Sequence, residues 1–171
     1  MKFFRAFSLV GLLMALQAAP AIASEQLPFE ASFHGTFQIT FRGCANADNL
    51  LSFAGPGLAI QTGLSSITGV SCLHPEATNP LCSTISDTTV TVTAANGDTF
   101  GFKNQAEDCV SFTPTGILIH GAGTYQILPG TGRFVQASGS GTVHTTAQGV
   151  LTSTGASGTF DPLVFSGTIS T

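Results

Sequence analysis

The residues from Phe29 to Phe41 alternate without interruption between apolar and polar side chains. In a β-strand, successive side chains point to opposite faces, so one face of this segment is rich in phenylalanine and the other is polar. At about 3.3 Å per residue the strand would be roughly 40 Å long, whereas most strands have about five or six residues. Long two-faced strands of this kind are typical of closed or strongly curled antiparallel sheets.

Alternation of the same kind continues along the chain. It predicts a second strand from Leu58 to Val70, interrupted at Gly63, and another from Thr88 to Thr93. Asn96-Gly97 has the residue types of a type I′ turn and predicts a hairpin. The more polar segment from Lys103 to Pro114 is expected to be a loop.

Glycines at alternate positions of several predicted strands indicate how the sheet closes. Gly121 and Gly123 share one face of their strand, and so do Gly139 and Gly141. Such positions allow the sharp coiling that a small barrel needs in order to close. We therefore predict a single all-β domain with about seven or eight antiparallel strands, arranged as a closed barrel or, alternatively, as a β-sandwich.

The first residues are typical of a secretory signal peptide. Lys2 and Arg5 precede an apolar run of about 13 residues, and Ala21-Ile22-Ala23 has the small side chains of a cleavage site. The run is shorter than the roughly 20 residues that a membrane-spanning helix needs. We expect cleavage after Ala23, so that residues 24–171 form one secreted or periplasmic domain without stable membrane insertion.

The charge balance excludes one class of partner. Beyond Ala23 the chain has three basic residues, Arg42, Lys103 and Arg133, against nine acidic ones. Three scattered cations do not neutralise a phosphate backbone, so nucleic-acid binding is not expected.

Four cysteines indicate an oxidising compartment. An even number in an exported protein predicts two disulfides, for which Cys44, Cys72, Cys82 and Cys109 allow three pairings. Because Cys72 and Cys82 bracket a proline-containing loop, we expect these two to pair and Cys44 to pair with Cys109. A zinc site with His74 beside Cys72 is the alternative, but the close cysteine pairs typical of zinc sites are missing, so we expect no metal and no cofactor.

Two side chains are weak candidates for catalysis. Arg133 follows a glycine-rich turn, where it would hold a ligand carboxylate at the barrel mouth or form a salt bridge with an acid such as Asp98. Tyr125 lies on the apolar face of its strand and either offers a hydroxyl to a cavity or fills the core.

The histidines carry no catalytic motif. His34, His120 and His144 all fall on polar faces of predicted strands, where exposure to solvent accounts for them. A Ser-His-Asp set cannot be read from the sequence, because such groups come together only in space.

Five short motifs occur in an order that resembles a known group. They are Ala94-Ala95-Asn96-Gly97-Asp98, Gly121-Ala122-Gly123-Thr124-Tyr125, Gly130-Thr131-Gly132-Arg133-Phe134, Ala137-Ser138-Gly139-Ser140-Gly141-Thr142 and Ser166-Gly167-Thr168-Ile169-Ser170. Together they resemble the allene oxide cyclase-like barrel group, to which plant dirigent proteins are related and which has many secreted bacterial members. The resemblance implies an eight-stranded antiparallel barrel with a largely apolar interior.

These observations favour a secreted, disulfide-braced barrel that binds a small apolar or amphipathic molecule without catalysis. The expected contacts are Phe33, Phe37, Phe41, Tyr125 and Arg133. Such a barrel should contain a cavity above about 100 Å³, because ligand pockets usually run to several hundred. The first alternative is a cyclase or dirigent-like protein that shapes a reactive intermediate. The second is a structural or surface-interaction protein of the envelope with a filled barrel, which would favour a homo-oligomer.

Overall fold

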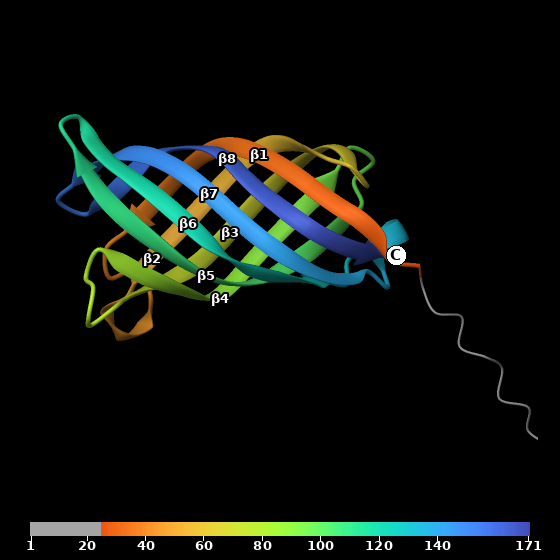
Figure 1. Ribbon diagram of the computed structural model, residues 1–171, viewed down its shortest axis with the longest axis horizontal. Helices are drawn as coiled ribbons and strands as arrows, with labels where there is room; N and C mark the ends of the chain where they lie inside the picture. Colours follow the sequence, from red (N-terminus) through yellow and green to blue (C-terminus); the bar gives the residue numbers. More distant parts are fainter. Residues whose placement is uncertain (1–24) are drawn as a thin grey trace, which may run out of the picture.

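The computed structural model describes residues 25–171, which form one closed eight-stranded barrel (Figure 1). Each strand pairs antiparallel with the next, and the last pairs with the first. The strands are β1 (Leu27–Thr40), β2 (Asn49–Ala59), β3 (Gly63–Pro75), β4 (Cys82–Ala94), β5 (Thr99–Thr113), β6 (Gly116–Leu128), β7 (Ser138–Thr152) and β8 (Gly155–Ser170). This confirms the predicted barrel. The predicted signal peptide lies outside the described residues.

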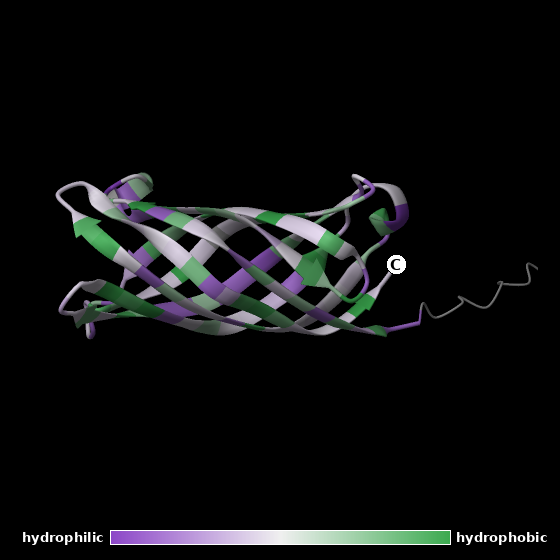
Figure 2. Ribbon diagram, turned by 90° about the horizontal axis from the view of Figure 1, so that it is seen from above, coloured by the Kyte–Doolittle hydropathy of each residue, from purple (hydrophilic) through white to green (hydrophobic). Residues whose placement is uncertain are grey.

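The alternation in the sequence accounts for the inside and outside of the barrel. In β1 the side chains of Phe29, Phe33 and Phe37 are buried, while His34 and Gln38, each directly after one of these phenylalanines, are exposed. Apolar and polar bands accordingly alternate along the strands in Figure 2. Most of the large buried side chains are therefore inside the barrel, and the outer wall is mainly polar. Within residues 25–171 no helix has the length and apolar character needed to span a membrane.

Glycine permits close contact between strands where the barrel coils. A Cβ on Gly35 of β1 would lie 2.1 Å from the carbonyl oxygen of Ala54 on β2 and 2.8 Å from the ring of Phe160 on β8. The pairing of β1 with β8 also shifts register between Phe33 and Gly35. The missing side chain lets the two neighbouring strands and the phenylalanine ring approach this point together.

Three sequence predictions about the strands were wrong in detail. The segment from Leu58 to Val70 belongs to two strands, because Gly63 has a φ of 68° at the start of β3 and the chain turns there instead of bulging. The predicted loop from Lys103 to Pro114 is instead mostly the second half of β5. Phe41 follows the end of β1 in a turn and is 40% exposed, so it does not continue the apolar face.

The two ends of the barrel differ. At the terminal end, where β1 begins and β8 ends, the short 3₁₀-helix η2 (Gly132–Phe134) lies at the rim of the barrel near the C-terminus. Its Phe134 is 1% exposed, and its ring lies 4.8 Å from that of Phe100. The opposite end, which we call the disulfide end, carries the connection from β1 to β2 with the 3₁₀-helix η1 (Ala45–Ala47).

Aromatic rings fill the terminal half of the interior. The rings of Phe102 and Phe165 stack with centroids 4.6 Å apart, and Tyr125 meets both edge-on at 5.0 and 5.3 Å. Phe29 packs against Phe102 and Tyr125 at 6.0 and 6.2 Å. Because all of these side chains are almost completely buried, this half is a packed core.

Both disulfides form, but the predicted pairing was wrong. Cys44 is bonded to Cys72, and Cys82 to Cys109. Cys82 stands directly opposite Cys109 on the neighbouring strand, with Cα atoms 4.0 Å apart, whereas Cys72 is opposite Ser86. Strand register, rather than closeness in sequence, therefore decides the partners. Two disulfides are typical of an oxidising location, extracellular or periplasmic.

Candidate functional site

A cavity of about 80 Å³ lies inside the disulfide half of the barrel. Its wall is mainly apolar and includes the rings of Phe37, Phe53 and Phe160. The volume is smaller than the 100 Å³ expected for a ligand-binding barrel, so in this structure it does not enclose a whole lipid-like molecule. Ile39 and Leu51 of the lining are only partly buried, which makes this half less completely filled than the terminal half.

Polar side chains face this apolar space from three strands. Asp108 and Asn104 come from β5, four residues apart on its inner face, and Ser71 and Thr145 come from β3 and β7. The hydroxyl of Ser71 donates a hydrogen bond to Oγ1 of Thr88, 3.1 Å away. The side-chain oxygen of Asn104 is buried and has no hydrogen-bond partner among residues 25–171. An unpaired buried acceptor of this kind costs about 1–3 kcal/mol, and a bound donor would remove that cost.

The carboxyl group of Asp108 is the unusual ionisable group of the cavity. Burial raises its pKa from the ordinary 3.8 to about 6, because its charged form is poorly solvated among apolar side chains. Gly121 stands directly opposite Asp108 on β6, and a Cβ at Gly121 would lie 2.0 Å from the Oδ1 of Asp108. The glycine thus leaves the space that the carboxyl group occupies. A titratable group in an apolar cavity is the usual sign of a binding or catalytic site.

We expect Asp108→Asn to change how stability depends on pH. Because the pKa is raised in the fold, the folded protein keeps a proton that the unfolded chain releases between pH 3.8 and about 6. The free energy of unfolding of the wild type should therefore fall by up to about 3 kcal/mol as the pH rises through this window. Asn does not titrate, so the variant should lack this fall. Urea denaturation between pH 4 and pH 8 measures the difference.

Glu107→Gln is the matched control for this experiment. Glu107 precedes Asp108 on the same strand but is exposed on the outer wall. Its removal should leave the fall in stability between pH 4 and pH 6 in place. If the free energy of unfolding depends on pH in the same way in the wild type and in Asp108→Asn, the assignment of this titration to Asp108 is contradicted.

The structure distributes the residues predicted to bind a ligand over several places. Phe37 lines the cavity, whereas Phe33 and Tyr125 are buried but are not among its lining residues. Phe41 is exposed in its turn. Arg133 lies at the terminal end, where its guanidinium carbon is 4.9 Å from the ring centroid of Phe134 and its backbone N–H donates to Asp98. These five residues therefore do not form one site.

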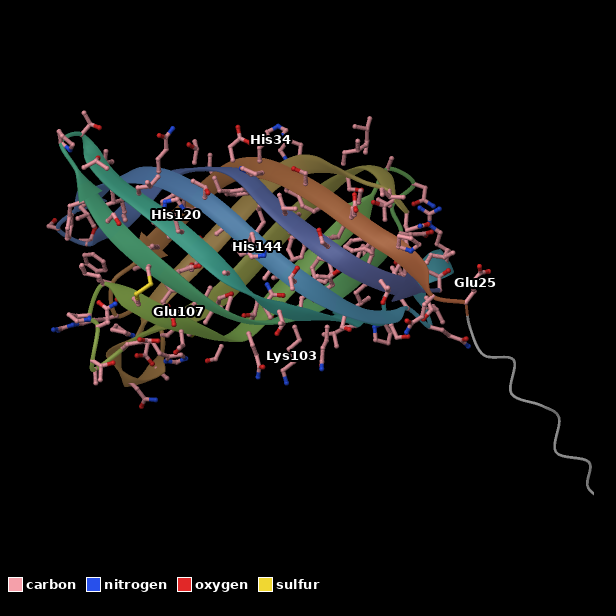
Figure 3. The ribbon with its side chains drawn as sticks, in the orientation of Figure 1. Glu25, His34, Lys103, Glu107, His120 and His144 are labelled. Carbon is pink, nitrogen blue, oxygen red and sulfur yellow. A yellow bond between two sulfur atoms is a disulfide. The ribbon has the colours of Figure 1, made fainter. Side chains whose placement is uncertain are left out.

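Histidines on the outer wall gather beside one disulfide. His120 of β6 and His144 of β7 are exposed, and with Glu107 and Cys109 they line a shallow depression of the surface (Figure 3). His34 is exposed on β1. Cys82, Glu107 and Cys109 lie close enough to share a metal ion, but both sulfurs are used in the disulfide and offer no thiolate.

The sequence interpretation missed Asp108 and Asn104. It placed both in a loop, although their spacing of four residues puts them on one face of a strand. The signal that was available is that the inward positions Phe100 and Phe102 continue without a break through Asn104, Ala106 and Asp108, while the residues between them from Lys103 onward are exposed. No protein-family model, curated protein or solved structure matches this chain. Its function is therefore argued from the geometry of the barrel.

Proposed function

We propose that this protein is an exported, disulfide-braced barrel that binds one end of a small amphipathic molecule at its disulfide end, without catalysis at that site. The observation that carries the proposal is the pair of polar side chains, Asp108 and Asn104, facing a mainly apolar cavity. The N-terminal segment ending at Ala23 and the two disulfides support export.

The polar groups define the chemistry of the ligand. The free oxygen of Asn104 accepts a hydrogen bond, and above about pH 6 the carboxylate of Asp108 accepts hydrogen bonds and carries a negative charge. A protonated amine or a hydroxyl group satisfies both requirements. The ligand is therefore an aliphatic or aromatic molecule with a donor group at one end.

The size of the cavity limits how deeply this molecule enters. About 80 Å³ accommodates a small end group rather than a whole chain, since a cavity that takes up benzene is about twice as large. The rest of the ligand lies against the partly exposed apolar side chains Ile39, Leu51 and Phe53. This arrangement differs from the sequence prediction of a cavity above about 100 Å³ contacted by five residues, because the cavity is smaller and only Phe37 of the five lines it.

The first test is native mass spectrometry of the protein from its own secretion host, before and after organic extraction. A discrete mass that extraction removes is the expected result. Titration with decylamine, 1-decanol and decane then tests the chemistry. We expect the amine to bind at pH 7.5, the alcohol more weakly and the alkane least. Asp108→Asn should weaken amine binding at least tenfold, and Gly121→Ala should also weaken it because the added methyl group meets the carboxyl.

The variant Glu107→Gln distinguishes amine binding at the buried Asp108 from non-specific attraction of cations to acidic side chains on the surface. It removes a charge of the same sign from the preceding residue of β5, which lies on the outer wall. Amine binding should be unchanged in this variant. A protein that carries no extra mass and binds none of the three probes would contradict the proposal and favour the filled, structural barrel.

A second candidate is a cyclase or dirigent-like protein, which the family resemblance implies. The observation that favours it is that burial in an apolar cavity raises the pKa of Asp108 to about 6, so this carboxyl group can take up and release a proton at mildly acidic pH, as general acid–base catalysis requires. Tyr125 and Arg133, the earlier candidates, do not line this cavity, so Asp108 replaces them. Turnover of a bound polyunsaturated epoxide or phenoxy radical, lost in Asp108→Asn, would support this candidate over simple binding.

A further inference from the structure

Outside the cavity, three polar side chains form a hydrogen-bonded chain on the outer wall of the disulfide end. His74 of β3 is in the middle, with its Nδ1 2.6 Å from Oδ2 of Asp48 and its Nε2 within hydrogen-bonding distance of Oγ of Ser86 on β4. Asp48 immediately precedes β2. Ser71 of β3 points into the cavity, and His74, three residues further along the same strand, points to the opposite side. The cluster therefore lies on the outer face of the barrel wall.

The chemistry of the partners assigns the protons. A carboxylate only accepts hydrogen bonds, so the Nδ1–H of His74 donates to Asp48. Nε2 then carries a lone pair, which accepts a hydrogen bond from the hydroxyl group of Ser86. Acid, imidazole and hydroxyl are therefore connected in the order that activates a serine as a nucleophile, with the imidazole as base and the carboxylate as the group that orients it.

The fold holds each member of the cluster in place. The disulfide from Cys44 to Cys72 ties the loop that carries Asp48 to β3, and the backbone N–H of Cys44 donates to the carbonyl of Asp48 at 3.0 Å. Cys72 stands opposite Ser86 in the sheet. The register between β3 and β4 also shifts beside Ser86, with one extra residue on β4. Bulges of this type redirect side chains and are frequent next to active sites.

The cluster is open to solvent. The side chain of His74 is 35% exposed and that of Asp48 is 17% exposed, while Ser86 is partly buried. A substrate would therefore approach from outside the barrel, with no need to enter the cavity. The orienting acid is the more protected partner, as a positioning group should be.

We propose that Ser86, His74 and Asp48 form a hydrolytic site for small, accessible carboxylic esters. Ser86 Oγ attacks the ester carbonyl carbon while its proton passes to Nε2 of His74. The intermediate expels the alcohol, which takes that proton, and leaves an acyl ester on Ser86. Water then attacks this ester with His74 as base, releasing the carboxylic acid and restoring the hydroxyl. This activity is independent of the ligand site around Asp108.

A fluorophosphonate probe tests the nucleophile directly on the purified, disulfide-intact protein. It forms a bond from phosphorus to an activated serine and releases fluoride. We expect one adduct, on the peptide that contains Ser86, together with hydrolysis of p-nitrophenyl acetate. Ser86→Ala should abolish both, and His74→Ala should slow labelling at least tenfold. Asp48→Asn should lower kcat and leave KM unchanged, because Asp48 does not touch the substrate.

Ser66→Ala is the control, since Ser66 is exposed on the same strand as His74. It should keep full labelling and hydrolysis. Thermal unfolding of each variant identifies any that does not fold, and the wild-type adduct remains informative in that case. Absence of an adduct on Ser86 in the wild type, or equal hydrolysis by folded Ser86→Ala, would overturn the proposal and leave the cluster as a brace for the loop.

Discussion

Replacing Phe165 with alanine is expected to lower the free energy of unfolding by about 3–5 kcal/mol, the usual cost of removing a buried phenylalanine. Phe165 is fully buried in the terminal half of the barrel. Its ring stacks on Phe102 and also contacts Phe33 and Tyr125 edge-on, with centroids 6.2 and 5.3 Å away. These neighbours come from three other strands, so truncation leaves a cavity that no single strand can close by shifting.

Urea denaturation of the wild type and the variant measures this difference. Phe112→Ala is the matched control, because Phe112 is exposed at the disulfide end of β5. Its truncation should change the free energy of unfolding by less than about 0.5 kcal/mol. A loss below about 1 kcal/mol for Phe165→Ala would show that the aromatic packing of this half is looser than described.

Removing either disulfide is expected to cost about 2–5 kcal/mol. The bonds join residues 28 and 27 positions apart, so they restrict the unfolded chain by similar amounts. The double variants Cys44→Ala/Cys72→Ala and Cys82→Ala/Cys109→Ala should therefore be destabilised to a similar degree. Peptide mapping of the oxidised wild type should recover these two pairs, and recovery of a Cys72–Cys82 peptide would contradict the structure.

The two double variants should differ in one respect. Only the bond from Cys44 to Cys72 secures the loop that carries Asp48. Its removal should slow labelling of Ser86 by the fluorophosphonate probe, while removal of the other bond should leave labelling unchanged. Equal labelling of the two folded variants would contradict a role for this disulfide in holding Asp48 against His74.

The barrel could be predicted because its strongest signals are local. The alternation from Phe29 onward identifies the buried face of β1 without reference to other strands. Asn96-Gly97 correctly predicts a turn between β4 and β5, but the turn is not of type I′, because Gly97 has a positive φ of 88° and Asn96 does not. Glycine-rich strands pointed to strong coiling, and Gly35 provides the close contact that makes it possible.

The candidate sites could not be predicted in the same way, because they depend on register between strands. The polar residues Asn104 and Asp108 face inward on β5 and made that part of the sequence look like a loop. The partners of His74 lie 26 and 12 residues away, on either side of it in the chain. Only the pairing of β2, β3 and β4 brings them together, and the pairing of β4 with β5 likewise places Cys82 opposite Cys109.

Tyr125 gives this protein a built-in optical reporter. It is the only tyrosine in a chain without tryptophan, so its ultraviolet signal comes from one known position. That position is 1% exposed, among phenylalanine rings, and its hydroxyl has no hydrogen-bond partner in the described part of the chain. Its emission therefore reports the packing of the terminal half alone. A change in the emission of Tyr125 when a ligand binds at the disulfide end would mean that binding there alters the packing of the terminal half.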